Sequence, residues 1–192
     1  MPRSKKKFEE IREERQQQIM EISLKLFAER GYSSVSIAEL ANAAGISKGL
    51  LYNYFISKEA LLKEIVDQQI NTFLNWLDPN HDWMLDNNEI KNYIKLLFAN
   101  ISENPEKWKN IMQLANQPDV VLLIHGKIDE ITQPVMKMMY NYFKNKNHKD
   151  PEVEIAVFSS ILSGVIQKYV YSPQYFPLDK IEKRILEIFN IN

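Results

Sequence analysis

One short stretch of the chain gathers side chains that can bind the grooves of DNA. Tyr52 and Asn53 follow Lys48 by four and five residues, so on a helix the three share one face. A lysine ammonium and a tyrosine hydroxyl can contact phosphate oxygens, and an asparagine amide can pair with the edge of adenine. Leu50, at the margin of this face, can contact a thymine methyl group. Gly49 lowers helix stability by about 1 kcal/mol relative to Ala, which favours close approach of another backbone.

Two short helices joined by a glycine turn are predicted to hold this face. The first is expected over residues 37–44, because Ser36 and Glu39 have the spacing of a capping box. Gly45 then stands where the chain must turn left-handed, a conformation that glycine adopts at little cost.

The second helix is expected over residues 48–55, with Ser47 as its N-cap. Leu51, Tyr54 and Phe55 lie opposite the polar face and should be buried. Caps, turn and burial pattern together predict a helix-turn-helix, which presents its second helix to the major groove. The alternative is an ordinary helical hairpin with a solvated polar face.

Charge is divided unevenly along the chain, whose net charge is −1. Residues 1–58 hold ten Lys and Arg against seven Glu, whereas the remainder holds fourteen against eighteen acidic residues. The helix-turn-helix end is therefore mildly basic, as DNA binding requires. Arg3, Lys5, Lys6 and Lys7 could follow phosphates or enter the minor groove as an arm. Without DNA we expect this tail to be solvated and disordered.

Several other functions are not supported by the residues. The chain has no Cys, which excludes disulfides and Cys-ligated metals. His81, His125 and His148 are far apart and lack metal-ligand spacing. No nucleophile elbow, phosphate-binding glycine loop or zinc-protease helix occurs, so we expect no enzyme activity, no cofactor and no metal. Without an apolar run of about 18 residues or a secretory signal, we expect a cytoplasmic protein that does not bind membranes.

The rest of the chain is predicted to be helical, because glycine is scarce and apolar residues recur with a period near 3.6. Pro134 should kink or interrupt the helix that contains it. The further helices are expected over residues 8–30, 58–77, 88–102, 105–116, 118–145, 151–171 and 179–189.

The expected helix over residues 151–171 is apolar nearly all round, so it must be covered on both sides. One side can face its own core, and the other is expected to meet a second subunit, with Gly164 allowing close approach. A central helix in a monomer is the alternative. Together with the last helix, the predicted dimer interface comprises Phe158, Ile161, Leu162, Gly164, Val165, Tyr169, Ile181, Ile185, Ile188 and Phe189.

These features have a known counterpart. The segment GYSSVSIAELANAAGISKGLLYNYFISKEALL resembles the N-terminal domain of the tetracycline-repressor (TetR) family of bacterial transcription regulators, with shared features from Ile19 through Leu62. The resemblance implies an all-α protein with a three-helix DNA-binding head and a larger ligand-binding and dimerisation domain, divided here into residues 1–57 and 58–192. It also implies a two-fold four-helix bundle at the dimer interface.

The resemblance assigns DNA contacts to residues at the starts of three helices and along the recognition helix. Leu50 and Asn53 depart from the family, which often has Thr and His at these positions, so the DNA sequence that is read should differ. The implied contacts are Ser36, Ile37, Ala38, Ser47, Lys48, Gly49, Leu50, Tyr52, Asn53, Tyr54 and Lys58.

Met and aromatic residues in the middle of the chain could line a pocket for a small apolar or amphipathic effector. Core packing explains most of these residues equally well. Gln133 is a further polar residue that could orient a ligand. The predicted pocket residues are Trp108, Met112, Gln113, His125, Met139, Phe143 and Phe158.

The sequence therefore predicts a regulator that binds DNA as a homodimer, most simply a repressor that a small molecule releases from a palindromic operator. A ligand-independent DNA-binding protein is one alternative. A helical sensor of small molecules or partner proteins that has lost DNA binding is another. An enzyme that uses the apolar pocket is a third, against which the lack of an acid–base or nucleophile set argues.

Overall fold

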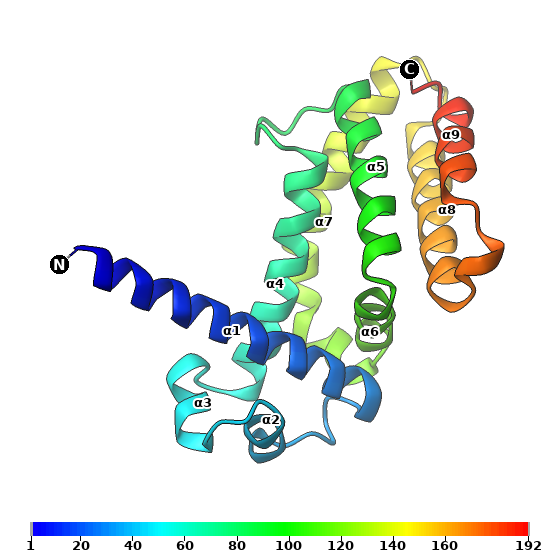
Figure 1. Cartoon of the computed structure of the whole chain (residues 1–192). Coiled ribbons are helices and arrows are strands. Elements are labelled where there is room, and N and C mark those ends of the chain that lie inside the picture. The colour runs from blue at the N-terminus through cyan, green and yellow to red at the C-terminus, as the bar shows by residue number, and fades with distance from the viewer. Residues whose placement is uncertain (1, 192) are drawn as a thin grey trace. The chain divides into compact units, whose positions relative to one another are not determined.

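The computed structural model describes residues 2–191, with side chains from residue 7 onward, and this part of the chain is all α-helical, which confirms the predicted fold class. The elements are α1 (Pro2–Arg30), α2 (Ile37–Ala43), α3 (Lys48–Tyr54), α4 (Lys58–Leu77), α5 (Asn87–Glu103), α6 (Pro105–Ala115), α7 (Pro118–Asn145), α8 (Pro151–Tyr171), the 3-10 turn η1 (Pro173–Tyr175) and α9 (Leu178–Ile188) (Figure 1).

Most helix ends lie within one or two residues of their predicted positions, and α1 is the exception. It begins at Pro2 rather than near Phe8. The backbone of the basic tail is therefore helical, and the expectation of a disordered tail without DNA was wrong. Proline suits the first turn of a helix, and the Lys, Glu, Arg and Gln residues that follow are good helix formers. Pro134 lies inside α7, which continues through it as one element.

The helices form two compact units. The head unit comprises residues 2–68 and 110–124, and the larger unit comprises residues 69–109 and 125–191. This division differs from the predicted boundary after residue 57, because both the first half of α4 and the segment joining α6 to α7 pack in the core of the head unit.

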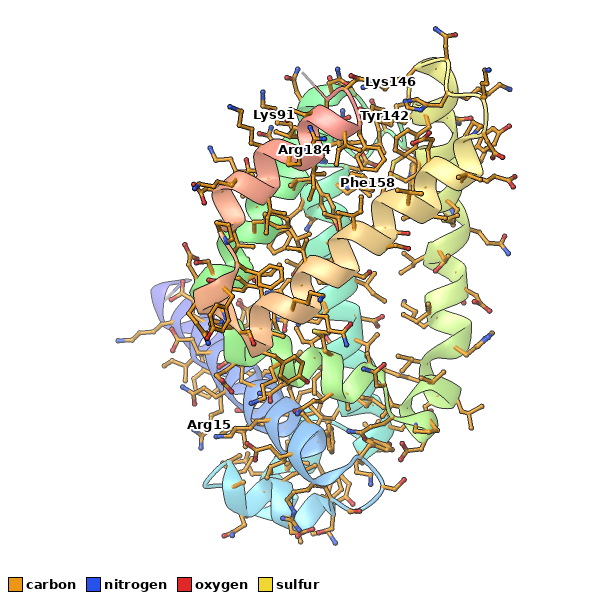
Figure 2. All side chains as sticks on the ribbon, turned by 90° about the vertical axis from the view of Figure 1, so that its right-hand side faces the viewer. Arg15, Lys91, Tyr142, Lys146, Phe158 and Arg184 are labelled. Atoms are coloured by element: carbon orange, nitrogen blue, oxygen red, sulfur yellow. The ribbon has the colours of Figure 1, made fainter. Side chains whose placement is uncertain are left out.

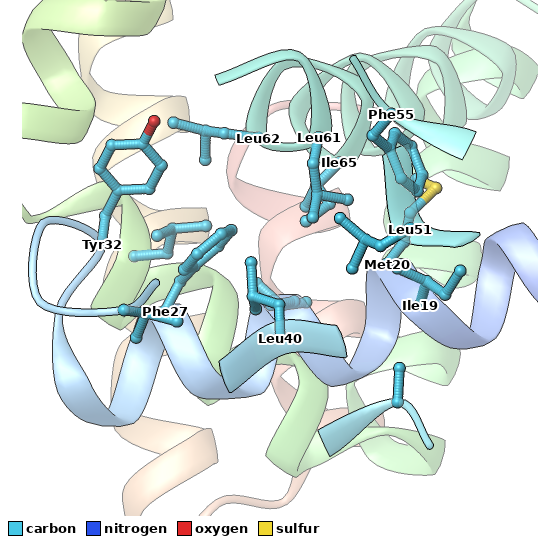
Figure 3. Packing of buried hydrophobic residues seen from close by; sticks show 14 of the residues in the cluster. Ile19, Met20, Phe27, Tyr32, Leu40, Leu51, Phe55, Leu61, Leu62 and Ile65 are labelled. Atoms are coloured by element: carbon cyan, nitrogen blue, oxygen red, sulfur yellow. The ribbon is translucent and has the colours of Figure 1, made fainter. Parts of the chain in front are cut away.

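The core of the head unit draws on helices that are distant in the sequence. Ile19, Leu40, Leu51 and Leu61 are fully buried in one cluster that joins α1, α2, α3 and α4 (Figure 3). Each such side chain contributes about 1.5–3 kcal/mol through burial. Val120 from α7 is buried in the same cluster, so the head unit is more than three helices.

Hydrogen bonds tie the start of α7 to the turn after α1. The Gln117 side chain donates through Nε2 to the Phe27 carbonyl oxygen at 2.8 Å and accepts through Oε1 from the Tyr32 backbone N–H at 2.7 Å. The Ser33 hydroxyl donates to the Asp119 carboxylate, and this bond lowers the pKa of Asp119. One glutamine thus satisfies two backbone groups of the head.

An aromatic cluster forms part of the core of the larger unit. The Phe158 ring on α8 lies 6.1 Å from the Phe143 ring on α7 and 5.1 Å from the Phe189 ring after α9, measured between centroids. Nearby, the Lys146 ammonium donates to the Asn190 carbonyl oxygen at 2.6 Å, which fastens the end of α9. Figure 2 shows Phe158 and Lys146 toward the same end of this unit.

Candidate nucleic-acid interface

The start of α2 is held by the predicted capping box. The Glu39 backbone N–H donates to Ser36 Oγ at 3.3 Å, and the Ser36 backbone N–H donates to Glu39 Oε2 at 2.8 Å. Arg30 adds an ion pair to the same carboxylate at 2.6 Å. The Ser36 backbone and hydroxyl donors, followed by Arg30, lower the pKa of Glu39 to about 2.

The turn and the cap of α3 also follow the predicted pattern. Gly45 adopts a φ of 65°, the left-handed conformation expected after the first helix. Ser47 Oγ accepts from the Leu50 backbone N–H at 3.1 Å and so caps α3. Leu51 and Phe55 are buried, and Tyr54 is half-buried. These contacts fix which face of α3 points away from the core.

That outward face is the surface predicted from the sequence. Lys48, Tyr52 and Asn53 are exposed and make no hydrogen bond or ion pair with any residue that the structure describes. Leu50 is also exposed. A Cβ added at Gly49 would meet no atom within 4 Å, so packing within the protein does not require glycine there. Three polar side chains and a glycine that leaves the helix backbone uncovered therefore lie together in solvent.

The remaining predicted DNA contacts differ in exposure. Ser36, Ala38 and Ser47 are exposed near the starts of α2 and α3, although both serine hydroxyls already serve as caps. Ile37 and Tyr54 are half-buried. These residues lie around the exposed α3 surface rather than on it.

Lys58 has a structural role that the sequence reading missed. Its ammonium donates to the carbonyl oxygens of Tyr32 at 2.8 Å and Val35 at 2.9 Å, and it lies 4.3 Å from the centre of the Tyr32 ring. The side chain is half-buried, and its ammonium is already engaged by the protein, unlike the free cation expected of a DNA contact. Carbonyl groups in the turn between α1 and α2 attract it, because they lie outside a helix and retain lone pairs that can accept; the Tyr32 carbonyl also accepts from the Val35 N–H at 3.3 Å.

Two further residues beside this surface were not anticipated. Arg12 on α1 lies over the Tyr54 ring, with 5.9 Å from its guanidinium carbon to the ring centre. Ile56, which follows α3, is 85% exposed. In the sequence Arg12 stood out only as one basic residue on the helix expected over residues 8–30.

The predicted pocket residues do not converge on one cavity. Trp108, Met139, Phe143 and Phe158 are buried in packed contacts, Met112 and Gln113 are half-buried in the head unit, and His125 is exposed and pairs with Asp129 at 2.9 Å. Two cavities in the larger unit have other linings. An open groove of about 890 Å³ lies along α7 near Trp83 and includes Gln133, and a smaller cavity of about 260 Å³ is lined by α4, α5 and α7.

The predicted dimer residues divide between the core and the surface. Ile161, Gly164, Tyr169 and Ile181 are half-buried, and Ile188 is exposed. The other five are buried within the protomer, so they cannot present surface to a partner; these are Phe158, Leu162, Val165, Ile185 and Phe189. The outward face of α8 instead carries Val153 and Val157, which are 53% and 43% exposed.

No group of three or more His, Cys, Asp and Glu side chains in the described part of the chain is arranged to hold a metal ion. By length and composition α8 could cross a membrane, although no run of this kind was expected. A single such helix is weak evidence, because core and interface helices have the same composition.

Comparison with known proteins identifies the N-terminal part of the chain. Residues 19–65 match the family described as "Bacterial regulatory proteins, tetR family". The HTH-type transcriptional regulator YuxN of Bacillus subtilis is 36% identical over 94 residues, which are 48% of this chain and 32% of that protein. The biofilm operon icaADBC HTH-type negative transcriptional regulator IcaR of Staphylococcus epidermidis is 29% identical over 104 residues, 54% of this chain and 55% of IcaR.

The chain thus spans about a third to a half of the length of these relatives. Over nearly its whole length it resembles the crystal structure of NalD, the secondary repressor of the MexAB-OprM multidrug efflux pump in Pseudomonas aeruginosa. The TM-score is 0.68 at 17% identity, with 92% of this chain and 95% of NalD covered. At that identity the likeness establishes the fold alone.

Proposed function

We propose that this chain, which belongs to the tetR family of bacterial regulatory proteins, represses transcription by binding an operator as a homodimer and leaves the DNA when a small molecule binds. The observation that carries the proposal is the outward face of α3. Lys48, Tyr52 and Asn53 are exposed there and unengaged by the described residues, while Leu51 on the opposite face is buried. Such a helix is built to present polar groups to a groove.

The recognition surface is centred on α3 and bordered by the α2 terminus. Lys48 and Tyr52 contact phosphate, and Asn53 reads a base edge. Gly49 allows the DNA backbone to approach closely. Around this centre the proposal retains as peripheral contacts Ser36, Ile37, Ala38, Ser47, Leu50 and Tyr54.

The homodimer is proposed to form through the outward face of α8. That face is lined by Val153, Ala156, Val157, Ser160 and Ile161 around a shallow depression. A Cβ at Gly164 would meet nothing within 4 Å in the protomer, so there is room for a second helix. A two-fold interface of this kind places two heads on half-sites about one DNA turn apart.

Release by a ligand is proposed to use helices that belong to both units. The first half of α4 lies in the head unit and its second half in the larger unit, and α7 is divided in the same way. A molecule that binds one arrangement of these helices better than another shifts the equilibrium between them. A coupling of about 1–3 kcal/mol would suffice. As a DNA-binding regulator the protein is proposed to act in the cytoplasm and to catalyse no reaction.

The direct test is retention of genomic DNA fragments by the purified protein and by the double variant Lys48→Ala/Tyr52→Ala. A hydrogen bond to a charged group contributes about 1.5–3 kcal/mol, so loss of two phosphate contacts should weaken binding of selected fragments by at least roughly 100-fold, with an unchanged thermal unfolding midpoint. Lys25→Ala is the matched control, because Lys25 is an exposed lysine on α1. If the wild type retains no fragment yet binds small molecules, the chain is a sensor without DNA binding.

A further inference from the structure

The loop that joins α4 to α5 in the larger unit carries oxygen-bearing side chains at a regular spacing (Figure 1). Residues 78–89 read DPNHDWMLDNNE, which is the spacing of the EF-hand calcium loop between two helices, except that Trp83 replaces its glycine. That loop supplies oxygens from positions 1, 3, 5, 7, 9 and 12, with the backbone carbonyl used at position 7. The corresponding residues here are Asp78, Asn80, Asp82, Met84, Asp86 and Glu89.

The backbone of this loop makes the turn that the glycine normally provides. Trp83 adopts a φ of 59°, and so does His81 two residues earlier. A bulky residue in this left-handed region is an uncommon exception. With the chain turned in this way, the N–H groups of Asp82 and Trp83 donate to the Asp78 carboxylate at 3.2 and 3.1 Å. The loop therefore curls around the first residue of the motif.

The last residues of the motif form the start of α5. The Glu89 N–H donates to Asp86 Oδ1 at 2.8 Å, and the Asp86 N–H donates to Glu89 Oε2 at 2.9 Å, which is a capping box. Asn80 Nδ2 also donates to Glu89 Oε1 at 3.1 Å, so the third and twelfth positions of the motif are in contact. The capping box accounts for Asp86 and Glu89, whereas Asp78 and Asp82 lie outside it.

The burial of Asp78 is a separate observation that indicates a cation. Its residue is only 3% exposed, and neither Asp78 nor any other carboxylate of the motif forms an ion pair with a Lys, Arg or His that the structure describes. A buried carboxylate is costly unless it is paired or coordinates a metal. One backbone N–H occupies each of its oxygens, and a carboxylate has about four acceptor sites in all. Both oxygens can therefore still contact a cation.

We propose that residues 78–89 bind one Ca²⁺ ion through the oxygens of these motif positions. This inference goes beyond the proposed function and does not depend on DNA binding. The expectation of no metal rested on Cys and His, whereas Ca²⁺ takes oxygen ligands. In the described conformation no three carboxylates are arranged to hold an ion, so binding requires Glu89 to release the Asp86 N–H and turn toward the ion. A flexible loop of many oxygens suits Ca²⁺ better than Mg²⁺, which demands a near-octahedral site.

The test titrates the full-length protein with Tb³⁺, which takes the same oxygen ligands as Ca²⁺ and luminesces when a nearby indole is excited. Trp83 lies within the loop, so Tb³⁺ should give a saturable emission. Ca²⁺ should displace it, and Mg²⁺ should do so at least about 10-fold less effectively. Trp83→Phe should remove most of the emission, while calorimetry still detects Ca²⁺ binding because the ligands remain.

Glu89→Gln separates the ion from the helix cap. Glutamine also completes a capping box at this position, so the unfolding midpoint without Ca²⁺ should stay unchanged at neutral pH. Loss of the carboxylate should weaken Ca²⁺ binding at least about 10-fold. Asp82→Asn, outside the box, gives the same test if the first variant fails to fold. Glu103→Gln, at an exposed glutamate on the same helix, should match the wild type.

Three results would overturn the proposal. They are no saturable terbium emission, displacement by Mg²⁺ as effective as by Ca²⁺, and equal Ca²⁺ affinity in Glu89→Gln and Glu103→Gln. None of these measurements contains DNA, so Ca²⁺ binding by a protein that retains no DNA fragment would uphold the ion site and overturn only the proposed function.

Discussion

The head unit and the larger unit differ in how closely the local sequence determines the structural role of each side chain. In the head unit, Ser36, Ser47 and Gly45 have local tasks as caps and turn, and the buried stripe is short. The polar groups left over on α3 therefore stand out. In the larger unit an apolar residue can belong to the core, a cavity or an interface. In the head unit the cap and turn residues can be set aside, so the remaining exposed polar residues indicate the functional face. On an apolar helix of the larger unit, the sequence does not separate core residues from interface residues.

The largest expected effect is on dimerisation and tests the assignment of the α8 face. Val157→Asp places a carboxylate where two copies of the helix should meet, and an unpaired buried charge costs several kcal/mol. We expect the dimer dissociation constant to rise by at least about 100-fold in sedimentation equilibrium, with operator binding weakened in consequence. Leu122→Asp, at an exposed leucine on α7, should leave the dimer intact. An unchanged dimer in the first variant would place the interface elsewhere.

Removing Gln117 should have the next largest effect, on the stability of the head unit. Gln117→Ala leaves the Tyr32 N–H without an acceptor and removes one of two donors to the Phe27 carbonyl, which also accepts from the Gly31 N–H. Losing such partners costs about 1–3 kcal/mol, which urea unfolding followed by circular dichroism would detect. Gln113→Ala removes a half-buried glutamine that has no such bonds and should cost less than about 1 kcal/mol. Equal losses would show that Gln117 is not a specific tie.

These outcomes bear on what could be predicted from the sequence. The helices, the capping box and the outward face of α3 were predictable because adjacent residues determine them. The Lys58 and Gln117 contacts were not, since each joins backbone groups distant in the chain. The sequence correctly predicted that α8 is a helix with apolar residues on most sides. It did not predict which of those residues face the core of the protomer and which face outward. Phe158 was assigned to the interface although the buried face includes it, and Val157 one position away is exposed.

Gly49 offers a smaller effect that separates folding from binding. Gly49→Ala should leave stability unchanged or raise it by up to about 1 kcal/mol, because alanine is the better helix former and space is free. Fragment binding should nevertheless weaken several-fold if DNA approaches this backbone. Gly45→Ala is the counterpart, since its φ of 65° should make alanine destabilising by about 1–2 kcal/mol without adding a group to the α3 face. Unchanged binding in Gly49→Ala would remove this position from the interface.

The smallest expected effect concerns acid. The folded pKa of Glu39 is about 2 against an ordinary value of 4.5. Ionised Glu39 therefore stabilises the fold fully above pH 4.5, and this contribution is lost as pH falls toward 2. Glu39→Gln should reduce the change in unfolding midpoint across that window, measured at low salt because the group is exposed. A variant with the same pH dependence as the wild type would show that ionised Glu39 in the capping box contributes little to folding stability.

The most direct test of the whole account is a hydroxyl-radical footprint of the wild-type protein on a fragment selected from genomic DNA. The account predicts two protected patches related by two-fold symmetry, with centres about one helical turn apart, and the loss of both patches in Lys48→Ala/Tyr52→Ala. A single protected patch would contradict the dimer. Failure to protect or retain any fragment at low ionic strength would contradict the claim that the α3 face reads DNA.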